Sequence, residues 1–391
     1  MNISRHSLIF GLSYALDIAG KNNLSHSKNT AYLSALISRE IGLDEDTVMI
    51  IYYAALLHDI GIGCNESDKQ KVYANDMKPH CIRGSEMIKK LPFPEHLSKC
   101  ILYHHENYDG SGPFGLMGEE IPQAAQIIWL ADAFDDEFGR FDNYDREMFL
   151  QIEDWLVKNS ALFSEEVKHA FSSLIGREYF LLDYFNHETK YALSDKIVVN
   201  DDVYYPLADV EKFALCFADI IDQRSSFTYH HSTGIAALAK KAAAHLGYDE
   251  ETQNKMYIAG LLHDVGKLHV SPDILHKNGP LMPEERFEIN KHTYFTRKIL
   301  EQIHGFEEIA NYAANHHEKL DGTGYPYQRT EDQLGELDMV MAICDVYQAL
   351  TEERPYREKL PAEKVWRIID DMVAKKHLDE TLVEKIRKIF V

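Results

Sequence analysis

The sequence predicts an all-α protein made of two tandem copies of one helical domain. Apolar residues recur at helical spacing along most of the chain, for example over residues 207–221. Glycine and proline gather in short stretches between such segments, as at residues 109–113 and 321–326, where they favour loops. One ordered pattern of histidines and aspartates occurs twice. The helical spacing gives the fold class, and the repeated pattern gives the two domains.

Length and charge narrow the class of protein. The chain has 391 residues, a length typical of two domains, and 45% of them are hydrophobic. The formal net charge is -22, and the acidic residues are spread along the whole sequence. Such a surface repels a phosphate backbone, so we expect no duplex nucleic acid among the partners. A small phosphorylated ligand stays compatible with this charge, because bound divalent metals reverse the field locally.

Cysteine usage and hydropathy indicate the cellular compartment. The five cysteines form no CxxC pair and their number is odd, which is typical of a reducing cytosol. We expect all of them to be buried as small hydrophobic residues. No apolar run approaches the roughly 20 residues of a membrane-spanning helix, so the sequence predicts a cytoplasmic protein without a membrane span. The cysteines are Cys64, Cys81, Cys100, Cys216 and Cys344.

The repeated pattern extends over a whole domain. An apolar run followed by His-Asp occurs twice, 205 residues apart. In both copies a histidine precedes this pair by 32 residues, and a later histidine precedes a His-His pair by 24 residues. Identical spacings in one order indicate an internal duplication, with domains expected at 1–176 and 207–391 and a linker at 177–206. The matched residues are His26, His58, Asp59, His80, His104, His105 and Asp132 in the first copy, and His231, His263, Asp264, His292, His316, His317 and Asp345 in the second; Asp17 and Asp222 also match.

These residue types at these spacings predict metal chemistry. Adjacent helical residues point about 100° apart, so a His-Asp pair reaches a metal only at the edge of its helix, where the aspartate can bridge two ions. Imidazole and carboxylate suit Fe, Mn, Zn or Ni. Five histidines and two aspartates per copy fit two ions better than one. Two close ions activate a shared water and hold a phosphate for in-line attack, which predicts phosphoester hydrolysis without a covalent intermediate.

With this pattern in view, the chain resembles the HD superfamily of phosphohydrolases. Residues 263–267 (HDVGK) resemble the HDxGK motif. Residues 316–326 (HHEKLDGTGYP) resemble the HHExxDGxGYP signature of HD-GYP domains, and residues 354–357 (RPYR) resemble the segment that follows it in that family. The resemblance covers most of the chain, which is thus similar to a tandem (duplicated) HD-GYP protein.

The resemblance implies an enzyme that hydrolyses cyclic di-GMP, or in some members cyclic GMP-AMP, to a linear dinucleotide or mononucleotides. It implies two divalent metals per active site, with Fe or Mn expected first and Zn or Ni as alternatives. One metal would be held by His231, His263, Asp264 and Asp345, and the other by Asp264, His292, His316 and His317. In this assignment Asp264 bridges the metals and takes part in catalysis.

The resemblance also assigns substrate contacts in the second copy. Lys267 would contact the scissile phosphate and stabilise developing charge. Arg354 and Arg357 would offer planar donors to phosphate or guanine. The glycines of the substrate loop allow close backbone approach. The residues expected to shape that loop are Gly322, Gly324, Tyr325 and Pro326.

Departures from the family pattern separate the two copies. The carboxylate that adds a third metal in some members is replaced by Asn22 and Phe227, so we expect two metals per site. Gln348 stands where many members carry a second aspartate, whereas the first copy keeps Asp135 there. The first copy has Ile62 in place of Lys267, and its loop, residues 112–114 (GPF), lacks the tyrosine. Our hypothesis is that the first copy is a weakened or regulatory metal site and that the second does the chemistry.

Other functions fit parts of the pattern. The substrate could be cyclic GMP-AMP or a nucleotide monophosphate within the same reaction class. Both copies could instead form a non-catalytic module that senses cyclic dinucleotides or docks to a signalling protein such as a diguanylate cyclase. A purely structural metal protein fits poorly, because structural sites are usually closed four-ligand zinc cages. The complete ligand sets and Lys267 favour an enzyme.

Overall fold

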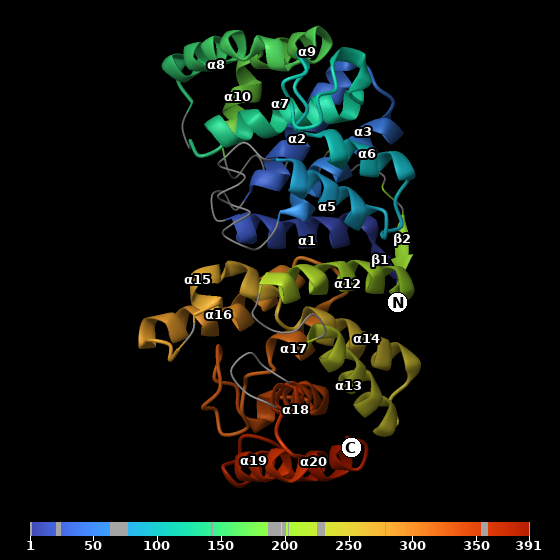
Figure 1. The fold of residues 1–391 in the computed structure, drawn as a ribbon, viewed down its shortest axis with the longest axis vertical. Coiled ribbons are helices and arrows are strands. Elements are labelled where there is room, and N and C mark those ends of the chain that lie inside the picture. Colours follow the sequence, from blue (N-terminus) through green and yellow to red (C-terminus); the bar gives the residue numbers. More distant parts are fainter. Residues whose placement is uncertain are drawn as a thin grey trace. The chain divides into compact units, whose positions relative to one another are not determined.

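The computed structural model describes residues 2–20, 25–62, 77–141, 144–186, 197, 201, 203–224, 231–277, 279–352 and 359–390. Helices dominate this part of the chain, which confirms the all-α prediction (Figure 1). The named strands of the described residues are β1 (Asn2–Ser4) and β2 (Tyr204–Pro206), which pair antiparallel with Ile3 opposite Tyr205.

Contacts divide the described residues into two compact units. The N-terminal unit contains residues 16–62 and 77–203, and the C-terminal unit contains residues 2–15 and 204–390. The first residues of the chain therefore pack with the second half: the Ser7 hydroxyl accepts a hydrogen bond from the His304 amide at 2.6 Å, within the C-terminal unit. The domain boundaries at 176 and 207 stay a prediction of where each sequence repeat ends.

In the N-terminal unit, helix α2 packs against α3, α7 and α9. Side chains begin several helices: the Asp44 carboxylate accepts from the Thr47 amide before α3, and the Ser164 hydroxyl accepts from Val167 before α9. Helix α2 ends at Ile41, and the next residue, Gly42, has a φ of 91°, which favours glycine. Helix α1 begins in the C-terminal unit and ends in this one. The elements, with η marking a 3-10 helix, are α1 (Arg5–Gly20), α2 (His26–Ile41), α3 (Glu45–Leu56), η1 (His58–Gly61), α5 (Lys78–Ile88), α6 (Glu95–Tyr103), η2 (Gly118–Glu120), α7 (Gln123–Phe138), α8 (Arg146–Lys158), η3 (Ser160–Leu162), α9 (Glu165–Ile175) and α10 (Glu178–Phe185).

The C-terminal unit repeats this arrangement. Helix α13 packs against α14 and α18 as α2 packs against α3 and α7, and α16 packs against η4 and α17 as α5 packs against η1 and α6. Equivalent elements thus meet in equivalent pairs, as a duplication requires. The elements are α12 (Leu207–Arg224), α13 (His231–His245), α14 (Glu250–Leu262), η4 (Val265–His269), α15 (Pro272–Leu275), α16 (Pro283–Leu300), α17 (Glu307–Ala314), η5 (Glu331–Gln333), α18 (Glu336–Thr351), α19 (Ala362–Ala374) and α20 (Glu380–Arg387).

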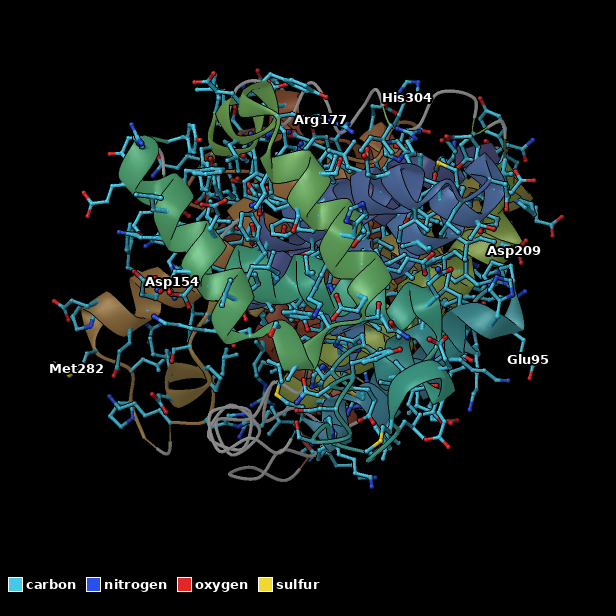
Figure 2. All side chains as sticks on the ribbon, turned by 90° about the horizontal axis from the view of Figure 1, so that it is seen from above. Glu95, Asp154, Arg177, Asp209, Met282 and His304 are labelled. Atoms are coloured by element: carbon cyan, nitrogen blue, oxygen red, sulfur yellow. The ribbon has the colours of Figure 1, made fainter. Side chains whose placement is uncertain are left out.

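Burial in both units follows the polarity of the side chains. The cores contain large rings such as Tyr52, Phe134 and Phe217, each fully buried. Charged side chains such as Glu95 and Asp154 point outwards from their helices (Figure 2). The four cysteines among the described residues are buried and form no disulfide, and Cys64 lies outside those residues. No described helix is long and apolar enough to cross a membrane.

Candidate metal centres and active site

The His-Asp pair of the C-terminal unit lies where one helix stops and a tighter one begins. Helix α14 ends at Leu262, His263 and Asp264 follow, and η4 begins at Val265. The last carbonyls of a helix lack helical partners, and the His263 Nδ1 atom donates to one of them, the Gly260 oxygen, at 2.8 Å. This bond leaves Nε2 facing away from the helix.

A glycine allows η4 to pack directly on α16. A Cβ atom at Gly266 would collide with the backbone oxygen of His292. The Gly266 amide instead donates to the Thr296 hydroxyl at 3.0 Å, and that hydroxyl donates to the His263 oxygen at 2.9 Å. These contacts fix Asp264 beside His292. In the N-terminal unit a Cβ at Gly61 would likewise meet the oxygen of His80.

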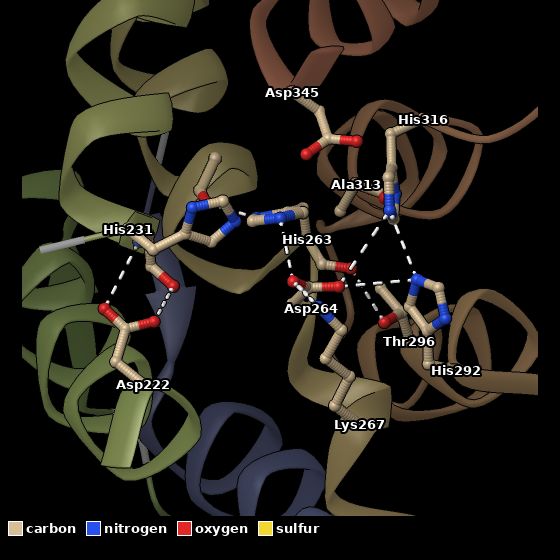
Figure 3. Close-up of polar contacts among 12 residues, drawn as sticks. Asp222, His231, His263, Asp264, Lys267, His292, Thr296, Ala313, His316 and Asp345 are labelled. Carbon is tan, nitrogen blue, oxygen red and sulfur yellow. Dashed lines mark hydrogen bonds and ion pairs between the residues drawn. The ribbon is translucent and has the colours of Figure 1, made fainter. Parts of the chain in front are cut away.

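Asp264 lies between two groups of histidines. Its Oδ2 atom is 3.1 Å from Nε2 of His263, and its Oδ1 atom is 3.3 Å from Nε2 of His292 and 4.0 Å from Nε2 of His316 (Figure 3). His317 lies 3.8 Å from Asp345, measured from Nδ1 to Oδ2. Six of the seven residues assigned to the second copy form two clusters, and within each cluster the ligand atoms lie within 4.8 Å of one another: His231, His263 and Asp264 in one, and His292, His316 and His317 in the other. The seventh, Asp345, lies beside the second cluster through His317.

The hydrogen bonds of His292 and His316 determine which ring nitrogen is available to bind a metal. The Nδ1 atoms of His292 and His316 lie 2.7 and 2.6 Å from the oxygens of Ile289 and Ala313. A carbonyl only accepts, so each Nδ1 carries the proton and each Nε2 keeps a bare lone pair. These two Nε2 atoms are only 3.3 Å apart. Two lone pairs at that distance repel each other, and a cation bound to both removes the repulsion.

Burial keeps these imidazoles neutral. Loss of water around the rings lowers the pKa of His292 to about 3 and of His316 to about 4. Burial also disfavours protonation of His263, but the charges of Asp264 and Asp345 outweigh it and raise its pKa. For Asp264, burial is outweighed by His263 and Lys267, so its pKa lies well below the usual range. The neutral imidazoles of His292 and His316 beside the ionised Asp264 are the protonation states that bind a divalent metal.

Two buried atoms add support for a metal. His263 Nε2 and Asp264 Oδ1 have no hydrogen-bond partner within the part of the chain that the structure describes. Buried polar atoms without partners are rare and call for an unseen ion or water. The donor set of imidazole nitrogens and carboxylate oxygens fits Fe, Mn, Zn or Ni.

The N-terminal unit builds a second cluster in the same way. His80 and His104 bring their Nε2 atoms to 3.1 Å, and Asp132 lies 3.1 Å from Nε2 of His26 and 3.4 Å from Nε2 of His58. Burial lowers the pKa of His80 to about 4 and of His104 to about 3. The seven residues assigned to the first copy therefore also converge, with His105 and Asp59 completing the set.

The cluster of the N-terminal unit differs in its immediate neighbours. The sulfur of Cys81 lies 3.9 Å from His80 Nε2 and 4.0 Å from His104 Nδ1. Burial raises the pKa of this thiol, so it stays protonated. Cys81 could not be placed here from the sequence, because a single cysteine within a helix is usually a small core residue.

A buried glutamate holds the loop that follows the His-His-Glu motif in each unit. Glu318 accepts hydrogen bonds from the amides of Tyr327 and Arg329, at 2.8 and 3.0 Å. Glu106 does the same for Phe114 and Leu116, at 2.6 and 2.7 Å. Both glutamates belong to the His-His-Glu motif, and no role was predicted for them from the sequence. Their position directly after the two histidines was the signal that could have identified them.

Two of the predicted substrate residues of the C-terminal unit, Lys267 and Tyr325, lie beside its cluster. The Lys267 ammonium is buried and contacts Asp264 Oδ2. The Tyr325 ring lies 5.0 Å from the His317 ring, and a Cβ at Gly324 would lie 2.5 Å from Glu318 Cα, so only glycine fits this turn. Gly322 has a φ of 75°, in the region that favours glycine. Arg354 and Arg357 lie outside the described residues, as do Asn22 and Phe227.

The duplicated aspartates Asp17 and Asp222 act at the helices that carry the first histidine of each set. Asp222 accepts from the Ser232 amide at 3.2 Å and from its hydroxyl at 2.6 Å, next to His231. Asp17 accepts from the Ser27 amide at 2.8 Å, next to His26. Their equal offset in the sequence showed that they match, and the structure shows that each holds the start of a helix.

An all-helical domain with inward-facing histidines and aspartates in two adjoining clusters defines a metal-dependent hydrolase of the HD type. Comparisons with known proteins agree. Two family models, both described as HD domain, match residues 23–137 and 216–382. The chain belongs to the HD-GYP family of phosphodiesterases and contains two HD domains.

Several characterised proteins are similar to this chain. 3'3'-cGAMP-specific phosphodiesterase 1 of Vibrio cholerae is 28% identical, over 98% of this chain and 91% of its own length. 3'3'-cGAMP-specific phosphodiesterase 3 of the same organism is 29% identical, over 76% of this chain and 64% of its own length. A cyclic di-GMP phosphodiesterase of Thermotoga maritima is 31% identical, over 46% of this chain and 50% of its own length.

One solved structure has the same fold along nearly the whole chain. The crystal structure of a cyclic GMP-AMP specific phosphodiesterase from V. cholerae superposes with a TM-score of 0.73. The superposition covers 99% of this chain and 98% of the other, at 22% sequence identity. The tandem arrangement of two helical domains is therefore shared with that protein.

Proposed function

We propose that this chain hydrolyses 3'3'-cyclic GMP-AMP to a linear product in its C-terminal HD domain, by attack of a metal-activated water. The observation that carries the substrate is the similarity to a 3'3'-cGAMP-specific phosphodiesterase over 98% of this chain. The cyclic di-GMP phosphodiesterase of T. maritima aligns with only 46% of the chain. Cyclic di-GMP, which the sequence motifs put first, thus becomes the second candidate substrate.

The metal-binding residues follow from the two clusters around Asp264. Bound divalent ions supply an activated water and a site for the phosphate. His231, His263, Asp264 and Asp345 would hold one ion, and Asp264, His292, His316 and His317 the other. Fe and Mn stay the first expectation for the metal, since the donor set alone does not separate them from Zn or Ni.

Two further side chains prepare the centre for a phosphodiester. The Lys267 ammonium contacts Asp264, and it is placed to donate a hydrogen bond to a phosphate oxygen and stabilise the charge that develops there. Burial raises the pKa of Tyr325, so its hydroxyl stays protonated and can donate a hydrogen bond to the substrate. Its ring packs beside His317 and limits the access of water to that side of the centre.

The N-terminal HD domain would hold metal without hydrolysing the substrate. It has a full set of converging ligands, but Ile62 stands in place of Lys267 and Pro113 in place of Tyr325. A metal site that lacks the lysine of this position is suited to a regulatory or weakened role. Docking to a signalling protein such as a diguanylate cyclase stays a prediction from the sequence.

Competing hydrolysis tests the substrate. Protein loaded with Mn²⁺ or Fe²⁺ would be given 3'3'-cyclic GMP-AMP and cyclic di-GMP separately and as an equimolar mixture, with products separated by chromatography. We expect both to be cut and kcat/KM to be at least about tenfold higher for 3'3'-cyclic GMP-AMP, equivalent to about 1.4 kcal/mol of transition-state binding. Equal values, or a preference for cyclic di-GMP, would overturn the proposed specificity.

A further inference from the structure

His231 is held by a side chain, whereas three other histidines of the same centre are held by the backbone. Its Nδ1 atom lies 2.8 Å from Oε2 of Glu352, and only 4% and 10% of the two side chains are exposed. The Nδ1 atoms of His263, His292 and His316 donate instead to carbonyls three residues earlier. The orientation of His231 therefore depends on a residue that a single substitution removes.

The N-terminal unit makes the equivalent contact with a different residue. The Nδ1 atom of His26 lies 2.8 Å from Oδ2 of Asp135, which follows the ligand Asp132 by three positions. Asp135 also accepts a hydrogen bond from the side-chain amide of Asn29 at 2.7 Å and one from the Tyr184 hydroxyl at 2.5 Å. A carboxylate with these donors holds the imidazole in one orientation.

This carboxylate occupies a different position along the corresponding helix in each unit, α7 in the N-terminal unit and α18 in the C-terminal unit. Three residues after Asp345 stands Gln348, a neutral amide that packs against Gly234. Glu352 follows one helical turn later, at the end of α18. The matching position in the N-terminal unit is Gly139, where any Cβ would collide with Asp135. Each unit thus provides a carboxylate at one of the two positions and an uncharged residue at the other.

We propose that Glu352 is the positioning residue that makes His231 a metal ligand, replacing the aspartate that performs this task in the N-terminal unit. A carboxylate that accepts the Nδ1 proton fixes the imidazole tautomer, so that the bare Nε2 faces the metal, and it increases the basicity of that nitrogen. Glu352 acts on the metal through His231 and does not itself touch the substrate. The inference rests on the proposed metal centre but not on the identity of the substrate.

Metal binding to the full chain tests this role. The variant background His58→Ala/Asp59→Ala removes ligands of the N-terminal cluster, so that Mn²⁺ uptake reports on the C-terminal cluster. In this background we compare Glu352→Ala, Glu352→Gln and the exchange variant Gln348→Asp/Glu352→Ala. The matched control is Glu363→Ala, at an exposed position of α19. Mn²⁺ affinity and stoichiometry are measured by calorimetry and elemental analysis, and thermal unfolding shows that each variant is folded.

We expect Glu352→Ala to weaken Mn²⁺ binding about 10- to 100-fold, the usual effect of losing a carboxylate behind a histidine ligand. Glu352→Gln should lose less, because the amide oxygen still accepts the proton. Gln348→Asp/Glu352→Ala should regain most of the affinity by restoring the arrangement of the N-terminal unit, and Glu363→Ala should match the parent protein. Unchanged affinity in Glu352→Ala, or no recovery in the exchange variant, would overturn the proposal. Failure to cleave 3'3'-cyclic GMP-AMP would leave these affinities unaffected and would count only against the proposed function.

Discussion

The Nε2 atoms of His292 and His316 face each other at 3.3 Å, although 24 residues separate them in the sequence. Both rings donate their Nδ1 protons to backbone carbonyls, so neither Nε2 has a proton to share. His80 and His104 repeat the approach at 3.1 Å in the other unit. Two buried pairs of imidazole nitrogens at such a short distance, each beside an aspartate, are best explained as metal ligands.

Removal of metal should reduce the stability of both units. A ligand that binds only the folded state stabilises it by about 2.7 kcal/mol when present at about 100 times its Kd. We expect chelated protein to unfold at a lower temperature and Mn²⁺ to restore the original value. His316→Ala should lower the metal content of the C-terminal cluster alone, and His104→Ala that of the N-terminal cluster alone. An unfolding temperature insensitive to chelation and to added metal would contradict the assignment of either cluster as a metal centre.

Substitution of Lys267 should separate metal binding from catalysis. Lys267→Ala removes the cation beside Asp264, and we expect turnover to fall about 100- to 1,000-fold, as when a group that stabilises developing charge is lost. The metal content should stay the same, because an ammonium group is not a ligand. Steady-state kinetics and elemental analysis of the same preparation measure both. Lys298→Ala, at a partly exposed position of α16, is the control, and full turnover in Lys267→Ala would remove Lys267 from the mechanism.

The glutamates that hold the loops after the two His-His-Glu motifs form a matched pair. Glu318→Gln replaces a carboxylate that accepts two backbone amides, so the loop carrying Tyr325 loses order. We expect KM for the cyclic dinucleotide to rise about tenfold or more, equivalent to the roughly 1.5–3 kcal/mol of a hydrogen bond to a charged group. Glu106→Gln makes the same change in the N-terminal unit and should leave KM unaltered. Equal kinetic effects of the two substitutions would mean that both loops serve one reaction.

The buried histidines predict how acid affects the metal-free protein. A histidine with a lowered pKa stays neutral in the folded state, whereas it takes up a proton in the unfolded chain as the pH falls below about 6.5. The unfolded state then binds more protons, so the free energy of unfolding decreases between pH 6.5 and about 4. The histidines concerned are His80, His104, His292 and His316.

Other titratable groups change the pH dependence of the free energy of unfolding less. His58, with a pKa raised to about 9, is protonated in both states below pH 6.5 and contributes a constant amount there. Asp17 and Asp136, with pKa values raised to about 6 and 7, act in the opposite direction but are fewer. We expect chelated protein to be less stable at pH 5 than at pH 7 by at least about 2 kcal/mol in urea unfolding. Equal or greater stability at pH 5 would show that the folded state protonates these rings.

Much of the fold and of both clusters could be predicted because their signals are local in the sequence. Helical spacing predicted the all-α class, and equal spacings of histidines identified the duplication and the ligands that converge in space. The partner of His231 could not be found in this way. Glu352 lies one helical turn after the position that matches Asp135 of the N-terminal unit, and only the fold shows that its carboxylate reaches His231 of α13. The same holds for Cys81, whose place beside His80 and His104 depends on how α5 meets the end of α6.

Product analysis with paired variants tests most directly whether the C-terminal HD domain is the phosphodiesterase. Mn²⁺-loaded wild type, His263→Ala/Asp264→Ala and His58→Ala/Asp59→Ala would each be incubated with 3'3'-cyclic GMP-AMP, and the linear product quantified. We predict product from the wild type and from the variant of the N-terminal unit, and none above background from the variant of the C-terminal unit. Product from His263→Ala/Asp264→Ala at the wild-type rate would contradict the account and place the chemistry in the N-terminal unit.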